Sequence, residues 1–198
     1  MQPPRILVVP GSNRSGSHNA RLAGAIVKAL TRLDCEITRI TLRDYELPLF
    51  DAGLERDNGQ PQNARKLARL FHEHDAVMLV SPEYNASLPP LTKNTIDWIS
   101  RVKSDDIGTL VPYRGKVFAV SSASPGVYGG MRCLIHLRAV LSTLGALVIP
   151  EQLALSRAGE AFDRLEALKD GQMVERMETM CASLVETARL LSPRRENE

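Results

Sequence analysis

Serine and glycine are concentrated in the segment 11–19, which also contains Arg14 and directly follows the first apolar run of the chain. The hydroxyl groups of Ser12, Ser15 and Ser17 can donate hydrogen bonds to phosphate oxygens, and the guanidinium of Arg14 can bind the same oxygens through two parallel bonds. The segment leads into a predicted helix, whose first amides and dipole favour an anion. These features predict a site for a terminal monophosphate. The alternative is an ordinary serine-rich turn that caps a helix.

The same segment departs from two common nucleotide-binding motifs. Gly11 and Gly16 have the spacing of a Walker A motif, but Ser17 and His18 stand where NTP hydrolysis needs Lys followed by Ser or Thr. The GxGxxG fingerprint of dinucleotide binding is also absent. We therefore expect neither NTP hydrolysis nor a dinucleotide fold. A structural or capping role is expected for His18.

Two further loops combine residue types that suit a flat ligand. The loop 81–90 has prolines at both ends, which stiffen it, and Tyr84 could stack on or beside a ring. The alternative is a surface loop in which Tyr84 covers apolar core. The loop 121–130 contains three glycines, which permit close approach of the backbone to a ligand. The loop 121–130, the third of the chain, is weak evidence by itself, since glycine-rich turns are common in α/β proteins.

Short apolar runs alternate with helical spacing along the chain, and this order predicts how the loops are positioned. Strands are predicted at Arg5–Pro10, Cys35–Leu42, Ala76–Ser81, Lys116–Ser122 and Ala146–Pro150, and helices at Asn19–Arg32, Gln62–His74, Pro89–Val102, Met131–Leu144 and about Gln172–Leu190. The stretch Arg43–Gly59 is predicted as a long irregular loop. Alternating strands and helices require right-handed crossovers, so we expect an α/β fold with a parallel sheet and helices on both faces. Ligands of such sheets bind at the carboxyl ends of the strands, where all three loops would meet.

Composition excludes several classes of protein. The 198 residues include 25 Lys and Arg against 23 Asp and Glu, a net charge of +2 that gives no footprint for nucleic acid or an anionic membrane. No apolar run approaches the ~20 residues of a membrane span, and the N-terminus lacks a signal-peptide pattern. Cys35, Cys133 and Cys181 form no CxxC pair and the histidines no HExxH pattern, so we expect reduced thiols, a cytoplasmic location and no metal site. A single domain, residues 1–198, is expected.

Four groups of residues carry a family resemblance between about residues 5 and 150. They are Gly11-Ser12-x-Arg14-x-x-Ser17-x-Asn19; Leu47-Pro48-Leu49-Phe50-Asp51; Ser81-Pro82-Glu83-Tyr84-Asn85 with Lys93-Asn94-x-x-Asp97-Trp98; and Ser124-Pro125-Gly126-x-x-Gly129-Gly130 with Leu137-Arg138 and Leu144-Gly145. With these motifs the chain resembles the NADPH-dependent FMN reductase family, which includes chromate, quinone and azo reductases of bacteria. The resemblance implies a flavodoxin-like three-layer sandwich with a five-stranded parallel sheet in the order 2-1-3-4-5, bound FMN and oligomerisation.

The resemblance also implies roles for individual residues. The FMN phosphate would be held by Ser12, Arg14, Ser17 and Asn19. The isoalloxazine ring would be bordered by Pro82, Glu83, Tyr84 and Asn85, and its pyrimidine edge by the loop 122–126 with Ser122, Ser124 and Gly126. The chain departs from the family at Ala86, where glycine is usual, and at Pro90, where a small residue is common. Both departures put the shape of the second loop in doubt.

FMN would supply the hydride chemistry, while the protein would supply orientation and electrostatics. NADPH or NADH would deliver hydride to flavin N5, leave, and be replaced in a ping-pong cycle by a small-molecule acceptor such as a flavin, a quinone, an azo compound or a chromate-like anion. No catalytic side chain is therefore assigned: Glu83 is expected to act through its backbone or an oligomer contact, and Asp105-Asp106 to form a solvated turn. A flavodoxin-type electron carrier is the alternative function, although carriers of that kind tend to be strongly acidic. A flavin-free regulatory domain is a third.

Apolar side chains on more than one face of the helix 89–102, including Trp98, predict self-association as a homodimer or homotetramer. The apolar Phe50 in the long loop supports the same expectation, and the alternative is that Trp98 and Phe50 complete the core of their own chain. The methionines of the last helix, Met173, Met177 and Met180, are expected in the core or an interface.

Overall fold

One five-stranded parallel sheet forms the centre of the computed structural model, which describes residues 2–106 and 108–191. Its strands are β1 (Arg5–Pro10), β2 (Glu36–Arg39), β3 (Ala76–Val80), β6 (Val117–Ala123) and β7 (Leu147–Leu155). Their spatial order is β2-β1-β3-β6-β7, and every neighbouring pair is parallel. The predicted flavodoxin-like order is confirmed, since β6 and β7 are the fourth and fifth strands of this sheet. Residues 1, 107 and 192–198 of the expected domain lie outside the described residues.

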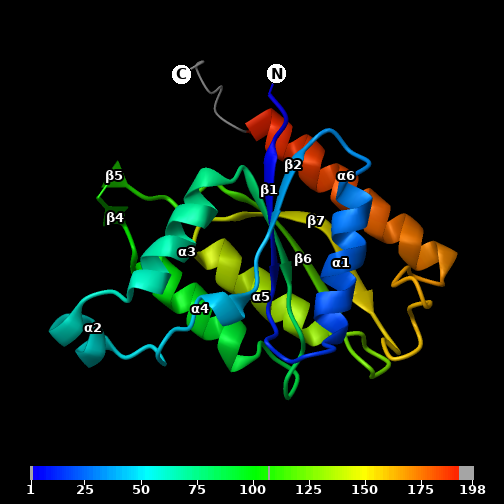
Figure 1. Ribbon diagram of the computed structural model, residues 1–198, viewed down its shortest axis with the longest axis horizontal. Coiled ribbons are helices and arrows are strands. Elements are labelled where there is room, and N and C mark those ends of the chain that lie inside the picture. The colour runs from blue at the N-terminus through cyan, green and yellow to red at the C-terminus, as the bar shows by residue number, and fades with distance from the viewer. Residues whose placement is uncertain (1, 107, 192–198) are drawn as a thin grey trace.

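Helices cover both faces of the sheet, as the alternating pattern predicted (Figure 1). The helices are α1 (His18–Leu30) and α6 (Gly171–Leu191) on one face, and α3 (Gln62–Glu73), α4 (Pro90–Arg101) and α5 (Met131–Thr143) on the other. Successive side chains of a strand point to opposite faces, so Ile6 and Val8 pack with α1 and α6 while Leu7 and Val9 pack with the other three helices. The central strands are therefore buried on both sides, which accounts for their continuous apolar runs.

The predicted loop 43–59 is partly helical, so its assignment as irregular throughout is wrong. A single 3-10 turn, η1 (Leu42–Asp44), precedes the short helix α2 (Ala52–Asn58), which projects from the body of the molecule (Figure 1). The Asp51 side chain accepts a hydrogen bond from the Leu54 amide at 2.7 Å and caps the start of α2. Gly59 ends α2 with a φ of 71°, which suits glycine.

Both edge strands differ in length from their predictions. β2 is only four residues long, and β7 continues five residues beyond Pro150, where a strand end was expected. Proline removes a backbone donor, which is tolerated on an edge strand or at an irregularity. β7 meets both conditions, because it lies at the edge and its register with β6 shifts between Phe118 and Val120.

A two-stranded antiparallel pair, β4 (Ser104–Asp105) and β5 (Gly108–Thr109), follows α4 and was not predicted. The Asp105 side chain is 2% exposed and accepts a hydrogen bond from Arg69 Nε at 2.8 Å. The expectation of a solvated turn is therefore wrong for Asp105. Asp106 beside it is exposed.

Trp98 is fully buried within its own chain, so the prediction that it packs against a second subunit is wrong. Its Nε1 donates a hydrogen bond to the Pro48 carbonyl at 2.8 Å, and the Phe50 ring meets it edge-on with the ring centroids 5.1 Å apart. Met177 and Met180 of α6 belong to the core, which is one of the two places expected for them.

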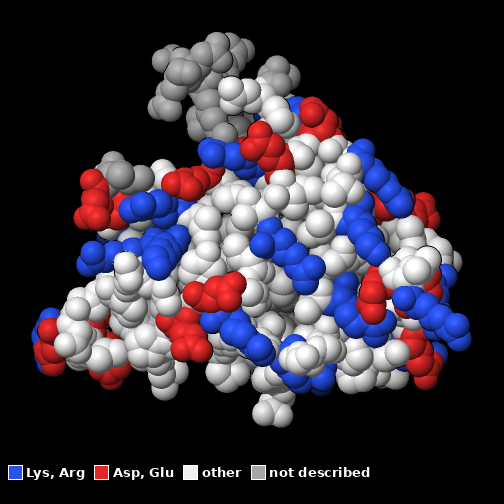
Figure 2. Space-filling view, viewed as in Figure 1, with Lys and Arg blue, Asp and Glu red and all other residues white. Residues whose placement is uncertain are grey.

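Basic and acidic side chains are interspersed over the face of the molecule seen in Figure 2, in agreement with the nearly balanced composition. Over residues 2–106 and 108–191, no helix is both long and apolar enough to span a bilayer. Within the same residues, no three His, Cys, Asp or Glu side chains come together as metal ligands would. The three cysteines are free thiols, two of them buried.

Candidate cofactor site

The three loops singled out in the sequence adjoin one another at the carboxyl edge of the sheet. Asn19, at the start of α1, connects the first loop to the third through both ends of its side-chain amide. Its Nδ2 donates to the Ala123 carbonyl at 2.8 Å, and its Oδ1 accepts from the Ala123 amide at 2.9 Å. The side chain is buried and its main polar contacts are used in this way. Asn19 therefore positions the first loop, which is a different task from the phosphate contact that the resemblance implied.

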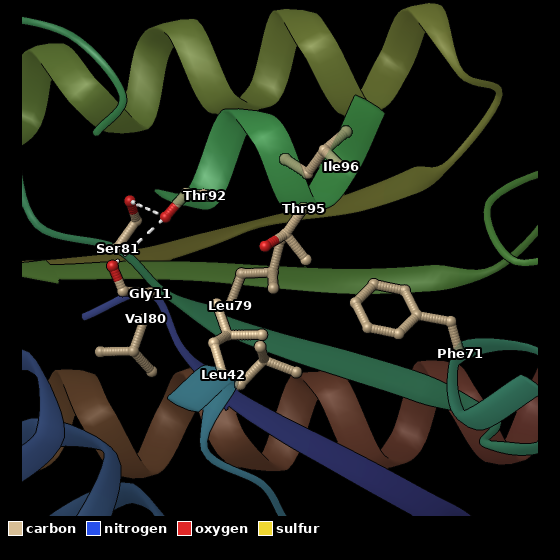
Figure 3. A pocket seen from close by; sticks show the side chains of 10 residues that line it. Gly11, Leu42, Phe71, Leu79, Val80, Ser81, Thr92, Thr95 and Ile96 are labelled. Carbon is tan, nitrogen blue, oxygen red and sulfur yellow. Dashed lines mark hydrogen bonds between the residues drawn. The ribbon is translucent and has the colours of Figure 1, made fainter. Parts of the chain in front are cut away.

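A buried group of hydroxyls connects the first loop to the second. The Gly11 amide donates to the Val80 carbonyl at 2.9 Å, so the first loop leaves β1 in register with β3. Behind Gly11 lies Thr92 of α4, whose Oγ1 is 3.3 Å from Ser81 Oγ and donates toward the Gly11 carbonyl at 3.5 Å (Figure 3). A Cβ on residue 11 would come within 2.3 Å of Thr92 Oγ1, so only glycine fits at this approach.

Glu83 connects the second loop to the start of α5, which follows the third loop. Its carboxylate accepts hydrogen bonds from Arg132 Nε at 3.0 Å and from the Cys133 amide at 3.1 Å. Burial acts to raise the pKa of the Glu83 carboxyl, but the hydrogen bonds from Arg132 and Cys133 and the charge of Arg132 together hold it below its ordinary value. The carboxylate is thus engaged with α5, and a free general base is absent at this position. The Arg132 guanidinium also lies over the Tyr128 ring, 5.1 Å from its centroid.

The first loop presents a mixture of engaged and open polar groups. Ser17 is buried and caps α1, accepting from the Asn19 amide at 3.2 Å, and Ser12 Oγ accepts from the Arg14 amide at 3.4 Å. The Arg14 side chain is exposed at the loop surface. Two buried atoms, Asn13 Oδ1 and His18 Nδ1, have no hydrogen-bond partner among the described residues. Buried polar atoms usually have a hydrogen-bond partner, so the first loop has two unused positions at which a polar ligand could bind.

His18 is the first residue of α1, where a structural or capping role was expected. Burial lowers the pKa of its imidazole, and the charges of Arg14 and Arg21 lower it further. The lowered pKa favours the neutral form of the imidazole.

The second loop contains a tight turn with strained backbone. Tyr84 and Ser87 exchange both backbone hydrogen bonds at 3.0 Å across Asn85 and Ala86, whose φ angles are 48° and 64°. Positive φ at both central positions is the geometry of a two-residue hairpin turn and favours Asn and Gly. Tyr84 projects from this turn with 51% of its surface exposed, whereas Pro82 is buried. Tyr84 therefore does not cover apolar core, which was the alternative expected for it.

The two candidate serines of the third loop, Ser122 and Ser124, differ in burial. Ser122 is fully buried, and its Oγ, which has no partner among the described residues, lies 1.9 Å from the position that a Cβ on Gly130 would take. A direct contact between the Ser122 hydroxyl and a bound cofactor is therefore not available in this conformation. Ser124 is half-buried, and its Oγ accepts from the Gly126 amide at 3.2 Å. Ser124 and Gly126 thus remain the accessible candidates of this loop.

Several residues that organise the site were not singled out as site residues from the sequence. Thr92 and Arg132 are examples, because a lone threonine or arginine on a predicted helix gives no signal of a long-range contact. Asn94, in contrast, belongs to the motif Lys93-Asn94-x-x-Asp97-Trp98 that carries the family resemblance. Its amide donates to the Pro48 carbonyl at 2.9 Å and accepts from the Phe50 amide at 2.8 Å, so the motif fixes the segment after η1.

Comparisons with known proteins agree with this architecture. Residues 4–160 match the family described as NADPH-dependent FMN reductase. A quinone reductase of Escherichia coli K12 is 35% identical over 145 residues, which is 73% of each chain. A NAD(P)H-dependent FMN reductase of Pseudomonas aeruginosa is 30% identical over 182 residues, 91% of this chain and 92% of that one.

Among solved structures, the flavoenzyme NAD(P)H:(acceptor) oxidoreductase of Paracoccus denitrificans superposes with a TM-score of 0.78. The alignment covers 95% of this chain and 98% of that one at 24% identity, and it shows that the fold is shared. The family match spans β1 to the end of β7 and therefore includes all three loops. On these grounds the chain belongs to the NADPH-dependent FMN reductase family, whose members are oxidoreductases that use FMN and NAD(P)H.

Proposed function

We propose that the three loops bind one FMN and that the protein uses it to reduce a quinone or similar planar acceptor at the expense of NAD(P)H. The observation that supports the proposal most directly is the convergence of the loops: Asn19 and Thr92 donate hydrogen bonds between them, and the Glu83 carboxylate accepts one from the Cys133 amide of α5. When bound, FMN would supply the hydride-transfer chemistry between NAD(P)H and the acceptor. Relatives named quinone reductase, and one named 2-hydroxy-1,4-benzoquinone reductase at 31% identity, favour a quinone as acceptor.

The residues of the first loop fit the phosphate and the ribityl chain. Arg14 is exposed at the loop and can pair with the phosphate, while the Ser12 hydroxyl and the first amides of α1 can donate to its oxygens. The two buried atoms without partners fit the same two parts of the cofactor. A neutral imidazole protonated at Nδ1 makes His18 a donor to the phosphate, and Asn13 Oδ1 can accept from a ribityl hydroxyl. Asn19 and Ser17 hold the first loop in place through their hydrogen bonds to Ala123 and to the start of α1.

The second and third loops are proposed to border the isoalloxazine ring. Glu83 contributes its backbone, because its carboxylate is used by α5. Asn85 lies in the tight turn, and the exposed Tyr84 can cover a ring or a planar acceptor. Ser124 and Gly126 are placed to meet the pyrimidine edge with backbone groups.

The protein's own contribution to the reaction is orientation and exclusion of water, and no side chain is assigned as acid or base. The Glu83 carboxylate is engaged with α5, and the His18 imidazole lies at the phosphate end of the site. We propose that donor and acceptor occupy the same slot in turn, which gives ping-pong kinetics.

The test is reconstitution followed by steady-state kinetics. The apoprotein is titrated with FMN, and the holoprotein is assayed with NADPH and NADH against a panel of quinones, flavins and azo dyes. We expect about one FMN per chain and parallel double-reciprocal lines for NAD(P)H against a quinone. Arg14→Ala is expected to weaken FMN binding by roughly 10- to 100-fold, since a charge-assisted hydrogen bond contributes about 1.5–3 kcal/mol. Arg32→Ala, which removes an exposed arginine paired with Glu178, is the matched control.

Each part of the proposal can fail separately. A wild-type protein that binds no FMN contradicts the cofactor assignment. Unchanged FMN affinity in Arg14→Ala contradicts the phosphate assignment, and intersecting kinetic lines contradict the shared slot. A holoprotein that is reduced by NAD(P)H but reoxidised only by a protein partner would instead establish an electron carrier.

We also propose that the chain forms a homodimer or homotetramer. Trp98 no longer supports this proposal, but α5 and the loop before it carry exposed apolar side chains: Val127, Tyr128 and Ile135 are 69%, 65% and 58% exposed. A cytoplasmic location remains part of the proposal and is supported by the free cysteines.

A further inference from the structure

We propose that Thr92 is a positioning residue for the phosphate end of the cofactor site, acting through the carbonyl of Gly11. This inference rests on the proposed function, and it concerns a helix residue that lies beneath the loops. Thr92 belongs to the first turn of α4 and is 4% exposed. It therefore acts on a bound cofactor only through the backbone that it holds.

The contacts of Thr92 cross three structural elements. Its Oγ1 lies 3.3 Å from Ser81 Oγ at the end of β3 and 3.5 Å from the Gly11 carbonyl at the end of β1. Ser81 Oγ in turn accepts from Cys133 Sγ of α5 at 3.5 Å and lies 3.2 Å from the Pro82 carbonyl. Figure 3 shows the Thr92 hydroxyl directed at both Ser81 and Gly11.

Gly11 is the residue through which the hydroxyl of Thr92 positions the first loop. Its amide donates to the Val80 carbonyl at 2.9 Å and its carbonyl accepts from Thr92 Oγ1 at 3.5 Å, so both backbone groups of the residue have a partner. The loop that follows carries Ser12 and Arg14, and its other end is fixed by Ser17 at the start of α1. A loop fixed at both ends presents its donors in one arrangement, and a small displacement at Gly11 would move Ser12 and Arg14 together.

The structure supplies a matched control in the same pocket. Thr95 lies one turn further along α4, is 5% exposed and lines the same small apolar pocket as Thr92 (Figure 3). Its Oγ1 donates to the Leu91 carbonyl of its own helix at 2.8 Å. Replacement of Thr95 by valine therefore removes a hydroxyl of equal burial without altering any contact to a loop.

The experiment compares FMN with riboflavin, which lacks only the phosphate. Apoproteins of the wild type, Thr92→Val, Thr92→Ser and Thr95→Val are titrated with both flavins by quenching of flavin fluorescence, and their thermal unfolding is recorded without ligand. Thr92→Val is expected to weaken FMN binding by about tenfold, because displaced Ser12 and Arg14 would contact the phosphate less well, and riboflavin binding by less than about twofold. Thr92→Ser restores the hydroxyl and is expected to restore FMN affinity, and Thr95→Val to match the wild type. Thr92→Ala adds no methyl group against Gly11 and gives a second reading of the same effect if Thr92→Val does not fold.

The outcomes separate this inference from the function on which it rests. A selective loss of FMN affinity in Thr92→Val or Thr92→Ala, with recovery in Thr92→Ser, supports the positioning role. An equal loss of FMN and riboflavin affinity, an unchanged FMN affinity, or a loss in Thr95→Val of the same size overturns it while FMN binding by the wild type stands. A wild-type protein that binds no FMN overturns the proposed function and this inference together.

Discussion

Ala86 has a φ of 64° in the tight turn of the second loop, a conformation that L residues other than Asn and Asp rarely adopt. The left-handed region costs a residue with a Cβ about 1–2 kcal/mol, and glycine at the same site loses roughly 0.5–1 kcal/mol of that gain to its more flexible unfolded state. We therefore predict that Ala86→Gly raises the free energy of unfolding by about 0.5–1 kcal/mol. In a domain of this size the melting temperature would rise by roughly 1–4 °C, which differential scanning calorimetry of the apoprotein measures.

The neighbouring residue is the control for that prediction. Asn85 has a φ of 48°, and asparagine tolerates this region through local hydrogen bonds of its short amide. Asn85→Gly should change the melting temperature less than Ala86→Gly. A lower stability of Ala86→Gly than of the wild type would show that the methyl group of Ala86 contributes packing that outweighs the strain.

His74 makes stability depend on pH. Burial is the main reason that the pKa of its imidazole lies below its ordinary value; the charges of Arg5 and Lys116 add to this, while Glu73 and the contact with the Leu70 carbonyl oppose it. The unfolded chain takes up a proton near pH 6.5 and the folded chain resists it, so the unfolded state binds more protons as the pH falls. Stability is therefore fully present above about pH 7 and decreases below about pH 6.5.

Urea unfolding of the apoprotein between pH 8 and pH 5.5 measures this dependence. His18 contributes in the same direction, since its pKa is also lowered by burial and by Arg14 and Arg21. His74→Gln is expected to flatten the decrease. A decrease of equal slope in His74→Gln would assign the effect to other groups.

At the scale of elements, Glu83 connects the loop after β3 to the first turn of α5. Its side chain is 8% exposed and accepts hydrogen bonds from Arg132 and from the Cys133 amide. One carboxylate therefore forms an ion pair and also binds a backbone amide in the first turn of α5. We predict that Glu83→Gln lowers the free energy of unfolding by about 1–3 kcal/mol, because the hydrogen bonds lost or weakened involve a charged group. Glu166→Gln, which breaks an ion pair with Arg21 at a side chain 53% exposed, should cost less than about 1 kcal/mol. Equal losses in the two variants, measured by chemical denaturation, would contradict this role of Glu83.

The elements also show what the sequence could and could not predict. Apolar spacing predicted α5, and Pro61 marked the start of α3, and both helices were placed to within a residue at each end. The short α2 was missed although Asp51 and Gly59 are good cap residues, since Gly53 and the absence of any buried side chain hide it. The extension of β7 past Pro150 depends on its edge position and its shifted register, which are tertiary properties.

The same division holds in the site. The three loops were predicted from serine, proline and glycine patterns, and the sheet order places them together as expected. Side-chain partners could not be predicted, because they join residues far apart in the chain: Asn19 with Ala123, and Thr92 with Gly11. Both Asn19 and Ser122 were expected to contact the cofactor, yet Asn19 is bonded to Ala123 and Ser122 is buried beneath the loop.

At the scale of the whole molecule, the remaining prediction concerns self-association. Ile135 projects from α5 with 58% of its surface exposed, close in sequence to the exposed Val127, Tyr128 and Met131, and a protein interface would remove this apolar area from water. We predict that light scattering of the holoprotein at micromolar concentration gives a multiple of 21.8 kDa and that Ile135→Glu shifts the mass toward one chain, since a charge buried in a two-fold interface meets its own copy or an apolar surface. Leu165→Glu alters a 77% exposed leucine in the turn before α6 and should leave the mass unchanged. A wild-type mass of one chain would end the proposal of self-association, and equal dissociation by both variants would remove α5 as its site.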